Sequence, residues 1–146
     1  MIHKKYFDST IEIDLATIRE NYLKLKSAAK NSICAATVKA NAYGLGLKDI
    51  ALTLSKAGCT NFFVAALGEA VFLRKHLKDA NIYVFHGIKK EEAASFFQYD
   101  ITPILNDIEQ IEIWNEFAKL SKRKLPAILH FDSGINRLGM DPEDAK

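Results

Sequence analysis

Lys39 is the residue of this 146-residue chain whose type and position most directly suggest covalent chemistry. It follows an apolar run that ends at Val38, and the glycines Gly44 and Gly46 come shortly after it. When a lysine is partly shielded from water its charged form is disfavoured, and the neutral amine is a competent nucleophile or base that can form a Schiff base with a carbonyl compound. The alternative, which the position alone favours, is a lysine that extends from a strand end into solvent.

A second segment with chemical potential lies about a hundred residues later, at residues 130–139, and reads HFDSGINRLG. Its Asp132 and Arg137 could hold a carboxylate substrate or a cofactor oxygen, because a guanidinium offers a planar fork of hydrogen-bond donors. The alternative is a turn that contains its own ion pair between these two residues. The segment alone leaves both interpretations open.

Short apolar runs that alternate with helical stretches must position these residues, and this alternation is typical of βαβ units with a parallel sheet. We predict five strands, at Ile33 to Val38, Phe62 to Ala66, Ile82 to His86, Ile101 to Leu105 and Ala127 to Phe131. Because functional groups of parallel α/β folds lie at the carboxyl ends of the strands, Lys39 and Arg137 are expected on the same face. His86 also ends a strand and could face the site, but we expect it to be a packed residue.

Helix signals separate the predicted strands. Asp14 suits an N-cap for an amphipathic helix that runs to about Lys30, and Gly58 suits the end of a second helix. A later helix is predicted to begin near Asn106, with Glu109 completing a capping box. Before the first helix, residues 9–14 alternate polar and apolar like a half-buried strand.

Two architectures fit five such units, an open doubly wound sheet and part of an eight-fold barrel. The glycine-rich phosphate-binding motifs GxGxxG and GxxxxGK[ST] are missing from the sequence. Composition does not choose between the two architectures.

Composition indicates one soluble globular domain, since 49% of the residues are apolar and 26% are charged. A net charge of +2 is too balanced for a nucleic-acid binder, and no apolar run approaches the roughly 20 residues of a membrane span. The start of the chain lacks an apolar signal core, so we expect a cytoplasmic protein. Cys34 and Cys59 are expected to be buried thiols, and no metal site is predicted.

Both chemical segments resemble motifs of the alanine racemases. VKANAYGLG at residues 38–46 is similar to the family's cofactor-lysine motif, and HFDSGINRLGM at 130–140 is similar to its arginine loop. Weaker similarity extends to IEIDL at 11–15 and FFVAALGEAVFLR at 62–74. The resemblance implies a partial (β/α)8 TIM barrel of about five units over residues 15–146. It also implies that residues 1–14 form a strand that pairs with a C-terminal β domain absent from this chain.

The resemblance further implies a pyridoxal-phosphate enzyme, an isomerase that interconverts L- and D-alanine and supplies D-alanine for peptidoglycan. Lys39 would hold the cofactor and move a proton on one face of the substrate α-carbon. Tyr43 would donate its hydroxyl to the cofactor phosphate. Arg137 would orient the substrate carboxylate and the cofactor phenolate.

The chain also departs from the family. Leu45 stands where histidine is usual, and His130 stands where some members carry a modified lysine. The opposite-face proton donor of the family is a tyrosine from the C-terminal domain of a partner subunit in a homodimer. We therefore expect this chain to be inactive alone, and to fold poorly or self-associate abnormally.

Three alternatives stay open at this stage: a non-catalytic remnant, one half of a split racemase, and a serine racemase of similar architecture. A closed barrel typically takes about 250 residues, and residues 141–144 read as the start of another helix. We therefore expect an N-terminal fragment.

Overall fold

The computed structural model describes residues 9–141 and 143 and contains a five-stranded parallel sheet. Strand order follows chain order, from β1 (Ala36–Thr37) through β2 (Asn61–Val64), β3 (Asn81–Val84) and β4 (Thr102–Leu105) to β5 (Ile128–Leu129). Each neighbouring pair is parallel. The five predicted strands are confirmed, although each is shorter than the apolar run that predicted it.

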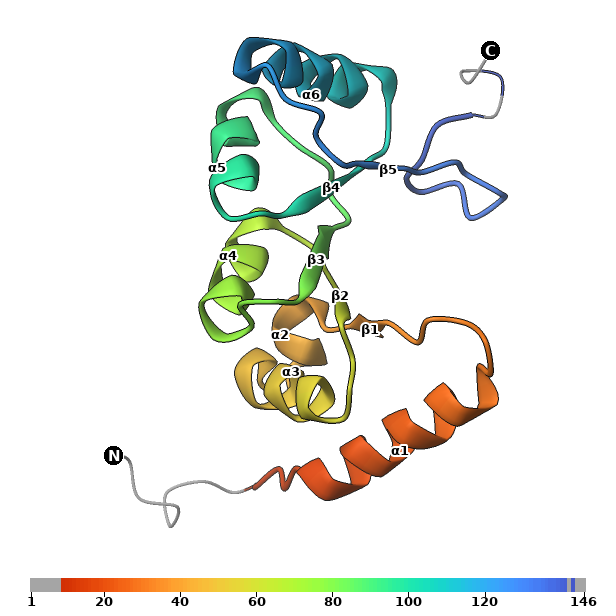
Figure 1. Ribbon diagram of the computed structural model, residues 1–146. Helices are drawn as coiled ribbons and strands as arrows, with labels where there is room; N and C mark the ends of the chain where they lie inside the picture. The colour runs from red at the N-terminus through yellow and green to blue at the C-terminus, as the bar shows by residue number, and fades with distance from the viewer. Residues whose placement is uncertain (1–8, 142, 144–146) are drawn as a thin grey trace.

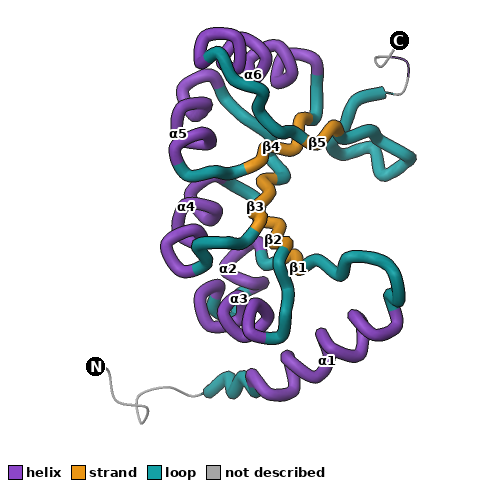
Figure 2. Tube along the Cα trace, viewed as in Figure 1, coloured by secondary structure: helices purple, strands orange, loops and turns teal. Residues whose placement is uncertain are grey.

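Helices alternate with these strands: α1 (Leu15–Ala28), α2 (Lys39–Tyr43), α3 (Leu47–Lys56), α4 (Leu67–His76), α5 (Ala93–Gln98) and α6 (Ile108–Ser121). Figures 1 and 2 show α2 to α6 on one side of a curved row of strands, with β1 and β5 at its two ends. A doubly wound sheet would reverse its strand order and carry helices on both faces. The fold is therefore the open, N-terminal part of a (β/α)8 barrel, as the resemblance implied.

The core lies between the sheet and its helices. Alternate strand residues such as Phe62, Val64, Ile82 and Val84 are buried there, in one cluster with Leu73 of α4. This alternation follows from the two-residue repeat of a strand, which sends successive side chains to opposite faces.

The opposite face of the sheet carries the intervening residues. Phe63 stacks on Tyr83 with 4.6 Å between ring centroids, and on Phe85 with 5.4 Å. These aromatic rings are only half-buried, and they rise toward the carboxyl ends of β2 and β3.

Several local predictions are confirmed. Asp14 caps α1, since its Oδ1 accepts hydrogen bonds from the amides of Ala16 at 2.8 Å and Thr17 at 3.2 Å. Gly58 follows α3 with a φ of +87°. Cys59 is buried as predicted, whereas Cys34 is only half-buried, and both thiols are free.

The cap of α6 is a correction. Asp107, not Asn106, accepts the hydrogen bond from the Gln110 amide, at 2.8 Å. Ile108, the first residue of α6, is 43% exposed.

The predicted N-terminal strand is not formed over residues 9–14, and residues 1–8 lie outside the described residues. A strand needs a partner to satisfy its backbone groups, and the described part of the chain places none beside this segment. Ile11 is accordingly 81% exposed. In the predicted helix start at 141–144, residues 142 and 144 also lie outside the described part. Among residues 9–141 and 143, no helix is both long and apolar enough to cross a membrane.

Candidate active site

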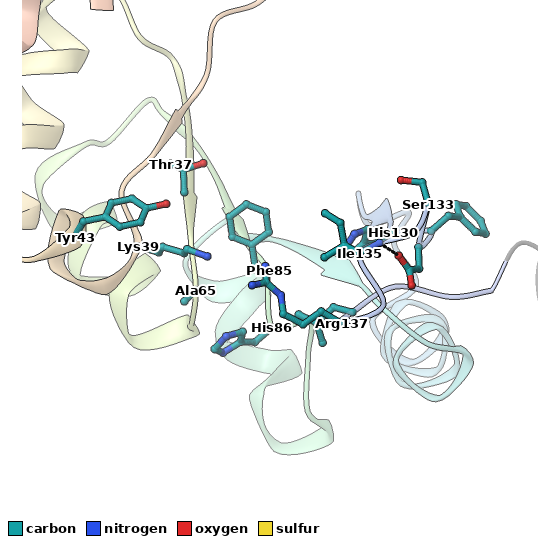
Figure 3. A pocket seen from close by; sticks show the side chains of 13 residues that line it. Thr37, Lys39, Tyr43, Ala65, Phe85, His86, His130, Ser133, Ile135 and Arg137 are labelled. Atoms are coloured by element: carbon teal, nitrogen blue, oxygen red, sulfur yellow. Dashed lines mark hydrogen bonds between the residues drawn. The ribbon is translucent and has the colours of Figure 1, made fainter.

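A cavity of about 680 Å³ lies at the carboxyl ends of the strands. It brings together Lys39, Tyr43 and Arg137, which come from loops about a hundred residues apart (Figure 3). The full lining is Thr37, Lys39, Tyr43, Ala65, Phe85, His86, His130, Phe131, Asp132, Ser133, Ile135, Arg137 and Leu138. The expectation that Lys39 and Arg137 share one face of the sheet is met.

Lys39 leaves the end of β1 and is half-buried. Its Nζ lies 5.5 Å from the centroid of the Phe85 ring, over the ring face. Figure 3 shows the side chains of Lys39 and Arg137 directed into the cavity from opposite sides. The amine therefore faces the cavity, and the reading of Lys39 as a solvent-directed lysine does not describe its geometry.

The backbone after Lys39 forms a left-handed turn made of residues other than glycine. Ala40, Asn41, Ala42 and Tyr43 have φ values of 52°, 54°, 54° and 56°. A left-handed conformation costs roughly 1–2 kcal/mol per residue that carries a Cβ. The positive φ values of this segment are therefore not confined to Gly44 and Gly46.

Contacts to two helices hold this turn in place. The Glu69 carboxylate, in the first turn of α4, accepts hydrogen bonds from the amides of Asn41 at 3.1 Å and Ala65 at 2.9 Å. Asn41 Oδ1 accepts a hydrogen bond from the Leu47 amide at 2.8 Å, at the start of α3. A strained backbone conformation persists when many surrounding contacts hold it. Here these contacts determine the positions from which the side chains of Lys39 and Tyr43 extend.

Tyr43 is 63% exposed and lines the cavity on the β1 side. Figure 3 shows its hydroxyl on the side of the ring that faces Thr37 and Lys39. A phenol hydroxyl in this position can donate a hydrogen bond to an anionic group in the cavity.

The arginine loop is organised by Asp132. Its Oδ1 accepts hydrogen bonds from the amides of Gly134 and Ile135, both at 2.9 Å, and its Oδ2 accepts one from Asn136 at 2.9 Å. The hydrogen bonds from the Gly134 and Asn136 amides lower the pKa of Asp132. Both oxygens of Asp132 are thus used within the loop, which favours a structural role for this residue.

Arg137 is exposed at the cavity wall. Within the described residues, the ion pairs are Arg74 with Asp100 and Lys90 with Glu116. The alternative of an internal Asp132–Arg137 pair is therefore not realised, and the guanidinium is available to an anion.

Several residues that line the cavity were not predicted to lie there. His86 is exposed and lines the cavity, so the prediction that it is a packed residue is wrong. Thr37, Ala65 and Phe85 also lie there, and each is at or just beyond a strand end, as Lys39 is. Their position at strand ends was the available signal.

The donor set suits an anion that carries a carbonyl group. A primary amine, a phenol hydroxyl and a guanidinium converge on the cavity from Lys39, Tyr43 and Arg137. The cavity volume falls within the roughly 300–1,000 Å³ of small-molecule and cofactor sites. The residues present therefore fit an aldehyde cofactor with a phosphate group.

Comparisons with known proteins agree with this geometry. The family model "Alanine racemase, N-terminal domain" matches residues 13–146. The alanine racemase of Rickettsia peacockii is 46% identical over 136 residues, which cover 92% of this chain and 38% of that enzyme. The chain thus spans less than two-fifths of the length of this curated relative.

Solved structures give the same picture. Alanine racemase from Bartonella henselae, solved with covalently bound pyridoxal phosphate, has a TM-score of 0.87 and 38% identity over 90% of this chain and 39% of its own. A histidine racemase from Leuconostoc mesenteroides has a TM-score of 0.81 and 28% identity over 90% of this chain and 36% of its own. The shared architecture thus occurs with more than one amino-acid substrate.

Proposed function

Because this chain belongs to the family of alanine racemase N-terminal domains, we propose that it is the cofactor-holding part of a pyridoxal-phosphate-dependent racemase, an isomerase of alanine. The observation that carries the proposal is the convergence of Lys39, Tyr43 and Arg137 on one cavity. The biological use that we propose is the supply of D-alanine for peptidoglycan.

Each of the three residues has a distinct task in this proposal. The Lys39 amine, held at the end of β1, would hold the cofactor by condensing with its aldehyde, whose oxygen leaves as water. The Tyr43 hydroxyl donates a hydrogen bond to the phosphate. The Arg137 guanidinium binds the substrate carboxylate and the phenolate oxygen, for which its planar fork of donors is suited.

Proton transfer at the α-carbon is the step that this chain supports from one side. Pyridoxal phosphate, when bound, withdraws electrons and stabilises negative charge at that carbon. The Lys39 amine would remove or return the α-proton on its own face. Inversion also needs a proton donor on the opposite face, because one group does not readily serve both.

Covalent trapping at Lys39 tests the proposal. The chain is incubated with pyridoxal phosphate, reduced with borohydride and digested, and the modified peptide is located by mass spectrometry. We expect a single dominant adduct at Lys39 that is lost in Lys39→Ala. Lys48→Ala, which removes an exposed lysine of α3, is the matched control and keeps the adduct. Equal labelling of many lysines, unaffected by Lys39→Ala, would contradict the proposal.

A second candidate is a cofactor-holding piece without turnover. The open sheet favours this candidate, because β1 and β5 do not pair with each other. The loops that line the cavity therefore come from only one part of a barrel. Chiral chromatography of alanine, serine and histidine incubated with the loaded chain separates the candidates. Turnover by the chain alone refutes the second candidate, and an adduct at Lys39 without turnover supports it.

A further inference from the structure

Asn106 lies buried just after β4 and uses its whole side-chain amide. It is 5% exposed, and its Nδ2 donates hydrogen bonds to the carbonyl oxygens of Phe85 at 2.8 Å and Ile104 at 3.1 Å. Carbonyl oxygens only accept hydrogen bonds, so the nitrogen of the amide must be the atom that faces them. The orientation of the amide is thereby determined by the ends of β3 and β4.

This orientation decides which nitrogen of His130 carries the proton. Asn106 Oδ1 lies 2.8 Å from His130 Nδ1. Because the amide oxygen is an acceptor, Nδ1 must be the donor, and a neutral imidazole has one N–H. The other ring nitrogen, Nε2, is then unprotonated and carries a lone pair.

The imidazole is also held by the loop around it. The backbone amide of His130 donates a hydrogen bond to the Leu105 carbonyl at 2.9 Å. The backbone carbonyl of His130 accepts a hydrogen bond from the Met140 amide at 2.8 Å. A Cβ at Gly139 would lie 3.3 Å from His130 Cδ2, so the ring packs closely on this backbone. His130 lines the cavity, and Nε2 is the ring nitrogen that is not bonded to Asn106.

We propose that Asn106 is a positioning residue that holds His130 protonated at Nδ1, so that Nε2 offers the cavity a hydrogen-bond acceptor. The two cations of the lining, Lys39 and Arg137, are pure donors, and an unprotonated Nε2 is complementary to them. The use of this acceptor in binding rests on the proposed function, whereas the protonation pattern of His130 does not.

The protonation pattern is tested on the chain without cofactor. Long-range ¹H–¹⁵N NMR spectra of the ¹⁵N-histidine-labelled chain, recorded at a pH where imidazoles are neutral, distinguish Nδ1–H from Nε2–H, and His130→Gln assigns the signal. We expect Nδ1–H in the unmodified chain and a shift toward Nε2–H in Asn106→Ala. An Nε2–H signal in the unmodified chain overturns the proposal, even if Asn106→Ala fails to fold.

The consequence for the site is tested by trapping with pyridoxal phosphate and borohydride. We expect Asn106→Ala to slow adduct formation at Lys39 about 10-fold, by analogy with the loss of a hydrogen-bond partner that orients a metal-binding side chain. If the unmodified chain takes no cofactor, the proposed function fails while the NMR result stands. If Asn106→Ala changes the tautomer but not the trapping rate, the positioning role is overturned.

Discussion

At the scale of residues, Asp132 and Arg137 have different roles within one short segment. The Asp132 carboxylate turns back to the backbone amides of its own loop, and Arg137 is left exposed at the cavity wall. Both are charged and polar, and their types alone would allow either to bind a ligand. Only the hydrogen bonds show that one shapes the loop that presents the other.

The lowered pKa of Asp132 predicts an acid-sensitive loop. The hydrogen bonds from Gly134 and Asn136 favour the carboxylate in the folded loop and so lower its pKa below the value in the unfolded chain. The stabilisation is therefore fully present above the unfolded pKa of about 3.9, and is lost as the pH falls through the lower folded pKa. We expect amide hydrogen exchange at residues 134–136 to accelerate selectively below about pH 4.

Asp132→Ala is expected to give the same fast exchange at neutral pH, and to weaken cofactor trapping by disordering Arg137. Asp79→Ala, at an exposed position before β3, is the matched control and leaves the loop unchanged. Slow exchange at residues 134–136 in Asp132→Ala would show that the carboxylate does not hold the loop.

The left-handed turn after β1 is the decisive feature at the scale of elements. It begins immediately after Lys39, and it is held by the first turn of α4 through Glu69 and by the start of α3 through Asn41. The two helices thus act on the lysine through backbone geometry. This arrangement ties the stability of the turn to the direction in which the amine points.

Replacing Glu69 should destabilise the left-handed turn and change the direction of the Lys39 amine. Glu69→Ala leaves the amides of Asn41 and Ala65 without their acceptor, and each hydrogen bond to a charged group contributes about 1.5–3 kcal/mol. The Asn41 amide is exposed and can bond to water instead, so we expect the free energy of unfolding, measured by urea denaturation, to fall by only about 2 kcal/mol. We also expect trapping at Lys39 to slow about 10-fold in the fraction that stays folded.

Glu112→Ala, at an exposed position of α6, is the matched control and should change neither quantity. If Glu69→Ala lowers stability while the trapping rate of the folded chain is unchanged, the turn does not orient the lysine.

The open sheet is the dominant feature at the scale of the whole molecule. Parallel sheets are normally covered on both faces, but here α2 to α6 cover one face and the aromatic rings of Phe63, Tyr83 and Phe85 stay half-buried on the other. At the β5 end, Leu129 is 52% exposed and Phe131 is 38% exposed. An apolar strand at a sheet edge invites pairing with another chain.

We therefore predict that this chain alone self-associates. Light scattering after size-exclusion chromatography should show an average mass that rises with protein concentration, and Leu129→Lys should reduce it, because a charge at an edge strand opposes pairing. Leu120→Lys, at a 76% exposed position on α6, is the control and should leave association unchanged. A monomer at every concentration that melts cooperatively would contradict the prediction.

The sequence by itself determined the features that depend on local pattern. Apolar runs located the five strands, Asp14 marked the start of α1, and the two motifs placed Lys39 and Arg137 at strand ends. These signals are local, because the periodicity of side chains and the capping of a helix involve residues a few positions apart.

Only the tertiary structure decided the features that depend on distant partners. The left-handed turn needs Glu69, the protonation of His130 follows from Asn106, and the lining position of His86 follows from the curvature of the sheet. The strand predicted at residues 9–14 is absent for the same reason, since no partner strand lies beside it among the described residues. Hydrogen bonds between remote segments are not encoded in any short window of residues, so sequence patterns locate the groups and packing decides what each one faces.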